Sequence, residues 1–311
     1  MIILAFETSH DDTSISICEF SENKEPIIHF LKTWTQSNYF AKFGGTIPEM
    51  ASRMHSENIL KLVIEAKENF DFKKINKIAY TEKPGLLGSL HIGFLVAKAI
   101  SQSLELELIP VNHLDGHFFA GEFVKKYEYP TLGIIVSGGH SQILFANSKN
   151  DIKILGQTQD DAIGELFDKI STKLQLGFPG GPVIDKLCKD NIDFNRIKIN
   201  TVHTDSKYDL SFSGNKSQVI NLANQNKYDK IDLACSLQEK AFEQLFNKVK
   251  LALNDYDVKT LIIGGGVAAN SYLRNNVKTL HNNVIIPPIY LSTDNAAMIA
   301  IAAYKKLGDN E

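Results

Sequence analysis

The sequence predicts an α/β protein built from two related lobes, and three observations support this fold class. Segments 2–20 and 131–146 each contain an apolar strand, a short polar turn and a second apolar strand. Segment 258–277 contains a strand, three glycines and a helix. Helical patterns separate these units, so we expect duplicated mixed β-sheets with flanking helices. We place one lobe at residues 1–112 and the other at 113–311, with the terminal helix packing back on the first.

The elements of the first lobe follow from local patterns. Alternation in "SISICEF", after the turn "ETSHDD", predicts a strand that returns beside the first one. Pro48 predicts a helix start in segment 46–70, because proline fits the first turn of a helix. Segment 77–104 reads as a strand, a Pro/Gly turn and a long apolar helix.

The second lobe repeats this plan with glycine-rich connections. Segment 131–146 is again strand, turn and strand, around "SGGH". Segment 160–176 predicts a helix, and the glycines and prolines of 177–187 predict a rigid loop. After the strand–glycine–helix unit, segment 292–304 starts a terminal helix.

The glycine- and hydroxyl-rich turns indicate anion binding. Backbone N–H groups exposed at such turns form anion-binding nests, and "GGG" allows a ligand to approach the start of the following helix. Taken singly, a glycine turn is more often a structural hairpin turn. The actin-like ATPase (ASKHA) architecture, with its inter-lobe cleft, typically has two hairpin turns that bind a phosphate, followed by a glycine turn that binds a nucleoside. This likeness of fold does not fix the chemistry.

Composition sets broad limits on function and location. The chain is 43% hydrophobic and 22% charged, with a net charge of -3, so no global basic field indicates nucleic acid, although a local lysine patch would suffice. Cys18, Cys188 and Cys235 form no CxxC pair, so we expect neither a disulfide nor a thiolate metal site. The apolar start reads as the first strand, and no stretch reaches membrane-spanning length. We expect a cytoplasmic protein without a membrane partner.

His113 and His117 are the first candidate metal ligands. They stand four residues apart in "PVNHLDGH", so on a helix they share one face. Such a pair is incidental about as often as functional. A third ligand must come from elsewhere, and Asp294 in "STDNAA" is our candidate, with a helix N-cap as its alternative role. Two imidazoles and a carboxylate would leave open positions on iron or zinc for a substrate oxygen. Leu114 replaces the glutamate that a zinc protease of this pattern requires.

The ordered motifs of the whole chain resemble one family, the tRNA N(6)-adenosine threonylcarbamoyltransferases. The motifs are "ETSHDDTS", "GGTIPEMASRMH", "PGLLGSLHIG", "PVNHLDGH", "VSGGHSQ", "DDAIGELFDK", "PGGP", "LSFSGNKS", "IIGGGVAANSYLR" and "STDNAAMIA". The resemblance implies the two-lobed actin-like fold. It also implies transfer of a threonylcarbamoyl group from threonylcarbamoyladenylate to adenosine 37 of tRNAs that read codons beginning with A.

The resemblance also implies site residues at the matching positions. His113, His117 and Asp294 would bind one divalent metal, with Fe²⁺ favoured and Zn²⁺ the alternative. The other positions would bind the donor or an adenine nucleotide: Ile135, Val136, Ser137, Gly138 and Gly139 as a substrate-binding turn, and Asp168, Gly181, Asp185 and Asn270 around the adenylate. Asp11 is a candidate general base for the amine proton, with a substrate phosphate as the competing acceptor.

Two positions depart from the family pattern, which usually reads "ETSCDET". His10 stands where the family has cysteine, and Asp12 stands where it has glutamate. His10 adds a titratable group near the proposed phosphate site, and Asp12 shortens an acidic side chain by one methylene. Asp11 matches the pattern.

Several further residues carry competing interpretations. Arg53 and His55, on the first helix, could reach the inter-lobe cleft, or could be solvated helix residues. Lys169 is expected to form a local ion pair or to be a solvated lysine, and Lys216 to meet an anion or lie exposed. Asn112 is expected to cap the helix that carries the histidines.

The resemblance implies partners as well as tRNA. In bacteria it implies a metal-free paralogue as the dimer partner and a small P-loop ATPase, and the compact chain favours this type over the kinase-containing complexes of archaea and eukaryotes. Two rival functions stay open at this stage. A small-molecule kinase of the same superfamily would not need the histidine pair, and a non-catalytic scaffold would be expected to lack it.

Overall fold

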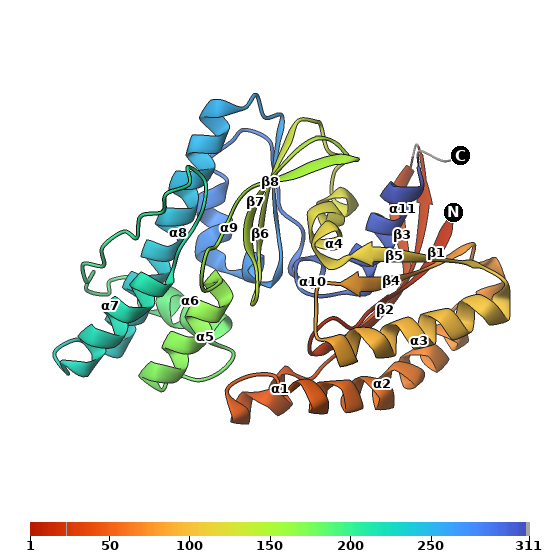
Figure 1. Ribbon diagram of the computed structural model, residues 1–311, viewed down its shortest axis with the longest axis horizontal. Helices are drawn as coiled ribbons and strands as arrows, with labels where there is room; N and C mark the ends of the chain where they lie inside the picture. The colour runs from red at the N-terminus through yellow and green to blue at the C-terminus, as the bar shows by residue number, and fades with distance from the viewer. Residues whose placement is uncertain (23, 309–311) are drawn as a thin grey trace. The chain divides into compact units, whose positions relative to one another are not determined.

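Two five-stranded mixed sheets with the same strand order form the framework of the computed structural model, which describes residues 1–22 and 24–308 (Figure 1). The first has the order β3-β2-β1-β4-β5, with β1 (Ile2–Glu7), β2 (Asp12–Ser21), β3 (Lys24–Thr35), β4 (Lys77–Lys83) and β5 (Glu107–Asn112). The second has the order β8-β7-β6-β9-β10, with β6 (Thr131–Val136), β7 (Ser141–Ser148), β8 (Asp151–Gln157), β9 (Thr260–Gly264) and β10 (Val284–Ile285).

Strand pairing repeats between the two sheets. The central strand β1 pairs antiparallel with β2 and parallel with β4, and β6 pairs in the same way with β7 and β9. The outer pairs also correspond: β2–β3 and β7–β8 are antiparallel, whereas β4–β5 and β9–β10 are parallel. This repetition confirms the duplicated α/β fold predicted from the two strand–turn–strand segments.

Helices surround both sheets. They are α1 (Ser37–Phe40), η1 (Ala41–Phe43), α2 (Pro48–Asn69), η2 (Phe72–Lys74), α3 (Leu87–Leu104), α4 (His113–Phe119), η3 (Ala120–Phe123), α5 (Ile163–Leu174), α6 (Gly180–Asp190), α7 (Ser213–Asn224), α8 (Lys230–Asp255), η4 (Gly266–Ala269), α9 (Ser271–Val277), α10 (Ile289–Ser292) and α11 (Ala296–Leu307). None of the helices in the described ranges combines the length and the apolar character needed to cross a membrane.

The chain divides into two compact units. Unit 1 contains residues 1–126 and 287–311, and unit 2 contains residues 127–286. The boundary expected from sequence, after residue 112, lies before α4. In the structure α4 contacts β5 and α11, so it stays with the first sheet.

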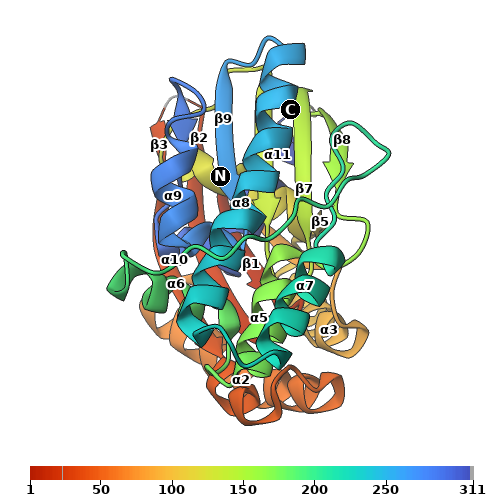
Figure 2. The same cartoon turned by 90° about the vertical axis from the view of Figure 1, so that its left-hand side faces the viewer.

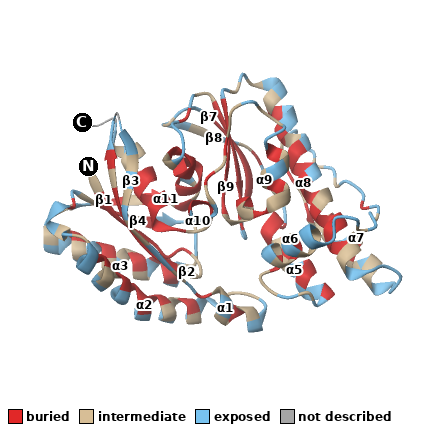
Figure 3. Ribbon diagram, turned by 180° about the vertical axis from the view of Figure 1, so that it is seen from behind, coloured by how far each residue is buried: buried red, intermediate tan, exposed pale blue. Residues whose placement is uncertain are grey.

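In unit 1, helices cover both faces of the sheet. Helices α2 and α3 run side by side along one face, and α11 packs on the other (Figure 1). The core between α2, α3 and the sheet contains Leu4, Phe6, Ile15 and Ile59, all almost fully buried. The outward sides of α2 and α3 are exposed (Figure 3). As predicted, α2 begins at Pro48.

In unit 2, a group of helices packs on the second sheet. The long helix α8 contacts α5, α6, α7 and α9, and these helices lie close together in Figure 2. Buried apolar residues of β6 and β9 join the same core as those of α5 and α8. The central strands are buried along most of their length, as Figure 3 shows. The core therefore fixes the strand ends from which the glycine turns extend.

The predicted rigid loop at 177–187 is wrong, because α6 begins at Gly180. Pro179 occupies the N-cap position and Pro182 lies in the first turn. A proline there removes no hydrogen bond, because the first N–H groups of a helix have no partner within it. The Pro/Gly run therefore starts a helix here, where the sequence had indicated a loop.

The expected absence of a disulfide is also wrong. Cys188 of α6 and Cys235 of α8 form a disulfide, with their α-carbons 5.4 Å apart. The two residues are 47 positions apart in sequence, and contact between α6 and α8 brings them together. Spacing alone could not reveal this pair. Cys18 is a buried free cysteine.

Gly265 should be required for stability because of its backbone conformation and surroundings. Its φ is +91°, and an added β-carbon would lie 2.2 Å from the carbonyl oxygen of Val136. We expect Gly265→Ala to reduce the free energy of unfolding by about 2–4 kcal/mol, through left-handed strain and a backbone clash. Gly266→Ala is the matched control, because no atom lies within 4 Å of its added β-carbon, and it should change stability by less than about 1 kcal/mol. Denaturant unfolding of both variants measures the difference. Equal unfolding midpoints for the two variants would contradict a requirement for glycine at position 265.

Candidate functional site

The histidine pair lies where β5 passes into α4. The Asn112 side chain accepts a hydrogen bond from the Leu114 N–H at 2.8 Å, so it caps α4 as predicted. The cap fixes the start of the helix at His113, which places His113 and His117 on adjacent turns of one face. Both imidazoles are almost fully buried.

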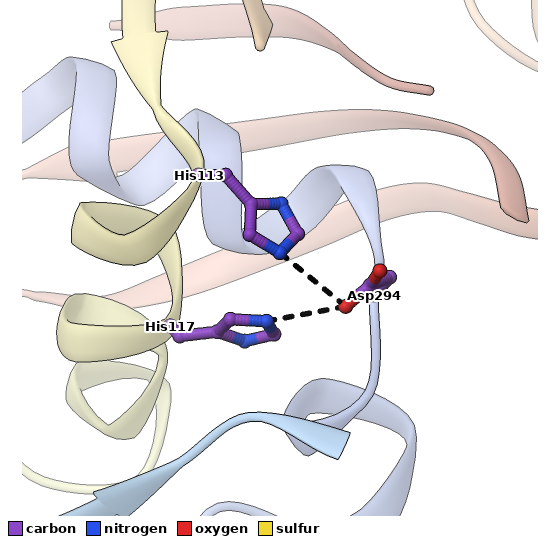
Figure 4. A group of neighbouring side chains, drawn as sticks. All are labelled: His113, His117 and Asp294. Carbon is purple, nitrogen blue, oxygen red and sulfur yellow. Dashed lines mark hydrogen bonds and ion pairs between the residues drawn. The ribbon is translucent and has the colours of Figure 1, made fainter. Parts of the chain in front are cut away.

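Asp294 meets the two imidazoles from the segment between α10 and α11 (Figure 4). Its Oδ1 is 3.1 Å from His117 Nε2 and 3.6 Å from His113 Nε2. The alternative role expected for Asp294, the helix N-cap, belongs to Asn295, whose side chain accepts from the Met298 N–H at 3.0 Å. Asp294 is therefore available as a ligand.

These three side chains form a group that could hold a metal ion. One ligand atom from each lies within 4.8 Å of the others. Imidazole nitrogen and carboxylate oxygen suit zinc and non-haem iron, and a site with three protein ligands leaves positions for a substrate. The donor set and its convergence fit a divalent metal.

Glu7 lies next to this group and belongs to the end of β1. Its side chain is fully buried and accepts hydrogen bonds from the Ser9 N–H at 2.5 Å and the Thr81 hydroxyl at 2.5 Å. His113 Nδ1 lies 3.0 Å from the same carboxylate. Burial alone would raise the pKa of Glu7, but the charge and hydrogen bond of His113 hold that pKa below its usual value. Glu7 is therefore an ionised buried group.

The pKa value of each candidate ligand depends on the charges of its neighbours. Burial lowers the pKa of His117. Burial acts on His113 in the same direction, but the carboxylates of Glu7 and Asp294 outweigh it and raise the His113 pKa to about 9. Burial would raise the pKa of Asp294, yet the two histidines hold it well below its usual range. Without a metal, the cluster thus binds a proton at His113.

Two acids with raised pKa values lie at the end of the β1–β2 turn, Asp11 in the turn and Asp12 as the first residue of β2. Burial, followed by the charge of Asp294, raises the pKa of Asp11. The same causes, together with Asp11, raise the pKa of Asp12 to about 8. A carboxylate whose pKa moves toward neutrality is better suited to proton transfer. His10 lies beside His113, with ring centroids 6.4 Å apart, and is not one of the three converging residues.

His55 holds this turn in place, and its interpretation as a solvated helix residue is wrong. It is fully buried, with Nε2 donating to the His10 carbonyl oxygen at 2.8 Å. Its Nδ1 accepts from the Thr13 hydroxyl, also at 2.8 Å. Arg53, one turn earlier, is exposed and pairs with Glu49, as expected for a surface residue.

The substrate-binding turn predicted in unit 2 connects β6 with β7. The Ser137 N–H donates to the His140 carbonyl at 2.8 Å, which closes the turn. Gly138 and Gly139 are exposed, with no atom within 4 Å of an added β-carbon. Ile135 and Val136 bury their side chains completely, so only their backbone can meet a ligand.

The start of α5 lies against this turn. The Glu165 N–H donates to the Gly138 carbonyl at 3.1 Å. Gly164 permits this approach, because an added β-carbon would lie 2.6 Å from the Ser137 carbonyl oxygen. Lys169 forms the expected local ion pair, at 2.7 Å from Asp161. Lys216 also pairs with Asp161, at 2.5 Å.

The other predicted nucleotide-binding residues also join elements of unit 2. Asp168 of α5 accepts from the Gly180 N–H at 2.6 Å, next to Gly181. Asp185, four residues after Gly181 on α6, accepts from the Ser271 N–H at 3.0 Å. Asn270 caps α9 by accepting from the Leu273 N–H at 3.1 Å. These contacts connect α5, α6 and α9 through the predicted side chains.

Sequence reasoning missed two residues around the candidate metal ligands. Glu7 and Thr81 contact each other beside His113. Glu7 had a readable signal, because an acid at the end of an apolar strand must be paired if it is buried. Thr81 gave none, because its role depends on contacts between distant segments.

The sequence of the chain is similar to that of known proteins. The family model of tRNA N6-adenosine threonylcarbamoyltransferase, TsaD, matches residues 29–301. A tRNA N6-adenosine threonylcarbamoyltransferase of Mycoplasmopsis synoviae (strain 53) is 49% identical over 314 residues, covering 100% of each chain. Its counterpart in Mycoplasma mobile is 49% identical over 308 residues, covering 99% of each chain.

Two solved structures show the likeness of fold. HypF from T. kodakarensis matches with a TM-score of 0.69 at 11% identity, over 99% of this chain and 48% of that one. The activator of 2-hydroxyisocaproyl-CoA dehydratase from Clostridium difficile, solved with bound ADPNP, matches with a TM-score of 0.54 at 14% identity, over 99% and 96%.

The duplicated sheets have the actin-like, ASKHA-type fold, and the His–His–Asp group is a candidate metal centre. Within that class, the chain belongs to the tRNA N6-adenosine threonylcarbamoyltransferase family.

Metal affinity should rise with pH across the neutral range. Because the pKa of His113 is raised to about 9 in the metal-free chain, its ring is protonated at lower pH, and a metal must displace that proton. The apparent dissociation constant for Zn²⁺ should therefore fall about tenfold per pH unit from about pH 7 to pH 8.5, with about one proton released. Competition with a chromogenic chelator, and calorimetry in buffers of different ionisation enthalpy, measure both. A pH-independent affinity would contradict this account.

Proposed function

We propose that this chain transfers the threonylcarbamoyl group of L-threonylcarbamoyladenylate to the N6 amine of adenosine 37. The tRNA substrates read codons that begin with A, and AMP is released. Full-length relatives that carry this activity in their names support the proposal. The observation that carries it in this chain is the His113, His117 and Asp294 group, which neither a kinase nor a scaffold of this fold requires.

The reaction is an acyl transfer at a carbonyl carbon. The N6 nitrogen forms a bond to the carbamoyl carbon, the bond from that carbon to the phosphate oxygen breaks, and AMP leaves with the bonding electrons. The amine loses one proton. Adenosine N6 is a weak nucleophile, so the enzyme must orient the donor and stabilise the charge that develops on oxygen.

In unit 1, His113, His117 and Asp294 would hold the metal, with Fe²⁺ favoured and Zn²⁺ the alternative. The bound metal would orient the donor and polarise one of its oxygens as a Lewis acid. The two histidines supply neutral nitrogen donors once His113 has lost its proton, and the low pKa of Asp294 keeps its carboxylate available.

In unit 2, we propose that the turn from Ile135 to Gly139 binds the donor through its backbone. The open space beside Gly138 and Gly139 leaves their N–H groups accessible to a phosphate or carbonyl oxygen. We further propose that Asp168, Gly181, Asp185 and Asn270 bind the adenylate portion. Their hydrogen bonds within α5, α6 and α9 would orient these groups before the ligand arrives.

tRNA is the macromolecular substrate that the family implies. We propose that the chain acts with a metal-free paralogue as its dimer partner and with a small P-loop ATPase, as in bacterial-type complexes. Relatives from several mycoplasmas support the bacterial type.

Removing both histidines should abolish transfer. The test supplies tRNA, threonine, bicarbonate, ATP, the adenylate synthase and the presumed partners, and measures modified adenosine by mass spectrometry. His113→Ala/His117→Ala should reduce modification by at least about 10²-fold, because the ligands of the metal are lost. His29→Ala is a matched control, since His29 pairs with Glu19 away from the cluster. Equal modification by both variants would show that His113 and His117 are not required for the reaction. No modification by wild type, with adenylate synthesis and partner binding established, would favour a kinase or a scaffold.

Asp11 should accept the proton of the amine. We expect Asp11→Asn to slow single-turnover transfer about 10²-fold, because the amide cannot act as a base, while metal content stays unchanged. The control is Asp115→Asn, an exposed acid on the same helix as the histidines. A normal single-turnover rate for Asp11→Asn would leave a substrate phosphate as the proton acceptor.

A further inference from the structure

The two oxygens of the Glu7 carboxylate contact different hydrogen-bond donors. Oε1 accepts from the Ser9 N–H at 2.5 Å. Oε2 accepts from the Thr81 hydroxyl at 2.5 Å and faces His113 Nδ1 at 3.0 Å. The side chain is fully buried. Burial of a carboxylate is costly unless it is satisfied, and these three donors satisfy it.

An ionised carboxylate accepts hydrogen bonds and donates none. The ring nitrogen that faces Glu7 must therefore carry a proton, which leaves His113 Nε2 as the nitrogen that can bind a metal. That atom is the one directed at Asp294 (Figure 4). Glu7 thus distinguishes between the two neutral forms of the ring.

The Ser9 hydroxyl, 3.2 Å from His113 Nδ1, does not make this distinction. A hydroxyl can donate or accept, so it is compatible with either form of the ring. His117 provides a second contrast, because its Nδ1 is buried without a hydrogen-bond partner among the described residues. The carboxylate that faces His117 is that of Asp294, itself a candidate ligand, so of the two histidines only His113 faces a carboxylate from outside the His113, His117 and Asp294 group among the described residues.

Glu7 is also held by the sheet. It pairs with Ser14 across the β1–β2 hairpin, and β1 is the central strand, hydrogen-bonded on both sides. Through the Ser9 N–H, the same carboxylate anchors the first residues of the turn that continues to Asp11. One side chain therefore contacts both a candidate metal ligand and the turn that carries the candidate base.

We propose that Glu7 is a positioning residue that fixes His113 in the form binding a metal through Nε2. The inference rests on the proposed metal-dependent function. Glu7 itself is not one of the three candidate ligands. Its effect reaches the reaction through the affinity of the metal and through the orientation of the His113 ring.

The test is the Zn²⁺ affinity of Glu7→Gln in the full chain, measured by competition with a chromogenic chelator. The glutamine amide group must replace one carboxylate oxygen. In one orientation the glutamine NH₂ group faces the Ser9 N–H, and the two donors clash. In the other orientation the NH₂ group faces Thr81 and His113 Nδ1. It then donates to Nδ1 and favours the ring form with the proton on Nε2, which cannot bind a metal through Nε2. We expect Zn²⁺ binding to weaken about 10–100-fold. The visible absorption spectrum of bound Co²⁺ should change as well, and circular dichroism monitors folding.

Two control variants separate this role from general effects. Glu19→Gln removes the charge from another Glu–His pair of the same sheet, the exposed pair with His29, and should leave Zn²⁺ affinity unchanged. Ser9→Ala removes the competing hydroxyl and should change affinity less than Glu7→Gln does. The inference fails if Glu7→Gln binds Zn²⁺ as wild type does, or if Ser9→Ala has the larger effect.

A measurement on the wild type covers the case in which Glu7→Gln does not fold. Nitrogen-15 spectra of the histidine rings, with His113 assigned by its loss in His113→Ala, should show a proton on Nδ1 and zinc on Nε2. The reverse arrangement would overturn the inference. Wild-type protein that binds no Zn²⁺ would overturn the metal-dependent function along with it, whereas normal wild-type binding with an unaffected Glu7→Gln overturns the role of Glu7 alone.

Discussion

The contact between Glu7 and His113 is the interaction on which the organisation of unit 1 depends. It joins the central strand of the sheet to the helix that carries both histidines, and His113 in turn faces Asp294. Charges alternate along this line of groups, of which Glu7 and His113 are buried and Asp294 is partly buried, so each stabilises the charged form of its neighbours. An unpaired member would be costly. The position of β1, the start of α4 and the segment before α11 are therefore mutually constrained.

Local patterns in the sequence predict much of this arrangement. Strand alternation and turn composition predict both hairpins, and Pro48 predicts the start of α2. The spacing of His113 and His117 predicts a shared helix face. These features depend on residues within a few positions of each other, where steric and hydrogen-bonding preferences are strong. Asp294 is a candidate ligand from its position at a predicted helix start, but nothing in its own neighbourhood distinguishes a ligand from an N-cap, and the family motifs favour the ligand.

The features that could not be predicted depend on distant segments. Cys188 and Cys235 meet because α6 packs on α8, and His55 is buried because α2 lies against the β1–β2 turn. A histidine at the same helical position would be solvated if that turn were absent. The α6 helix shows a related effect, because Pro182 is compatible with either a loop or the first turn of a helix, and packing decides between them.

The repeated strand order places residues 8–11 and 137–140 at equivalent hairpins of their sheets, yet the two turns have opposite electrostatic character. The first is surrounded by carboxylates, including Glu7, Asp11 and Asp294, which favour a cation. The second presents glycine backbone and no acidic side chain of its own, which favours an anion. A duplicated scaffold can thus separate attraction for a metal from attraction for a phosphate. The charge of each turn can therefore differ while the antiparallel strand pairing of the two hairpins stays the same.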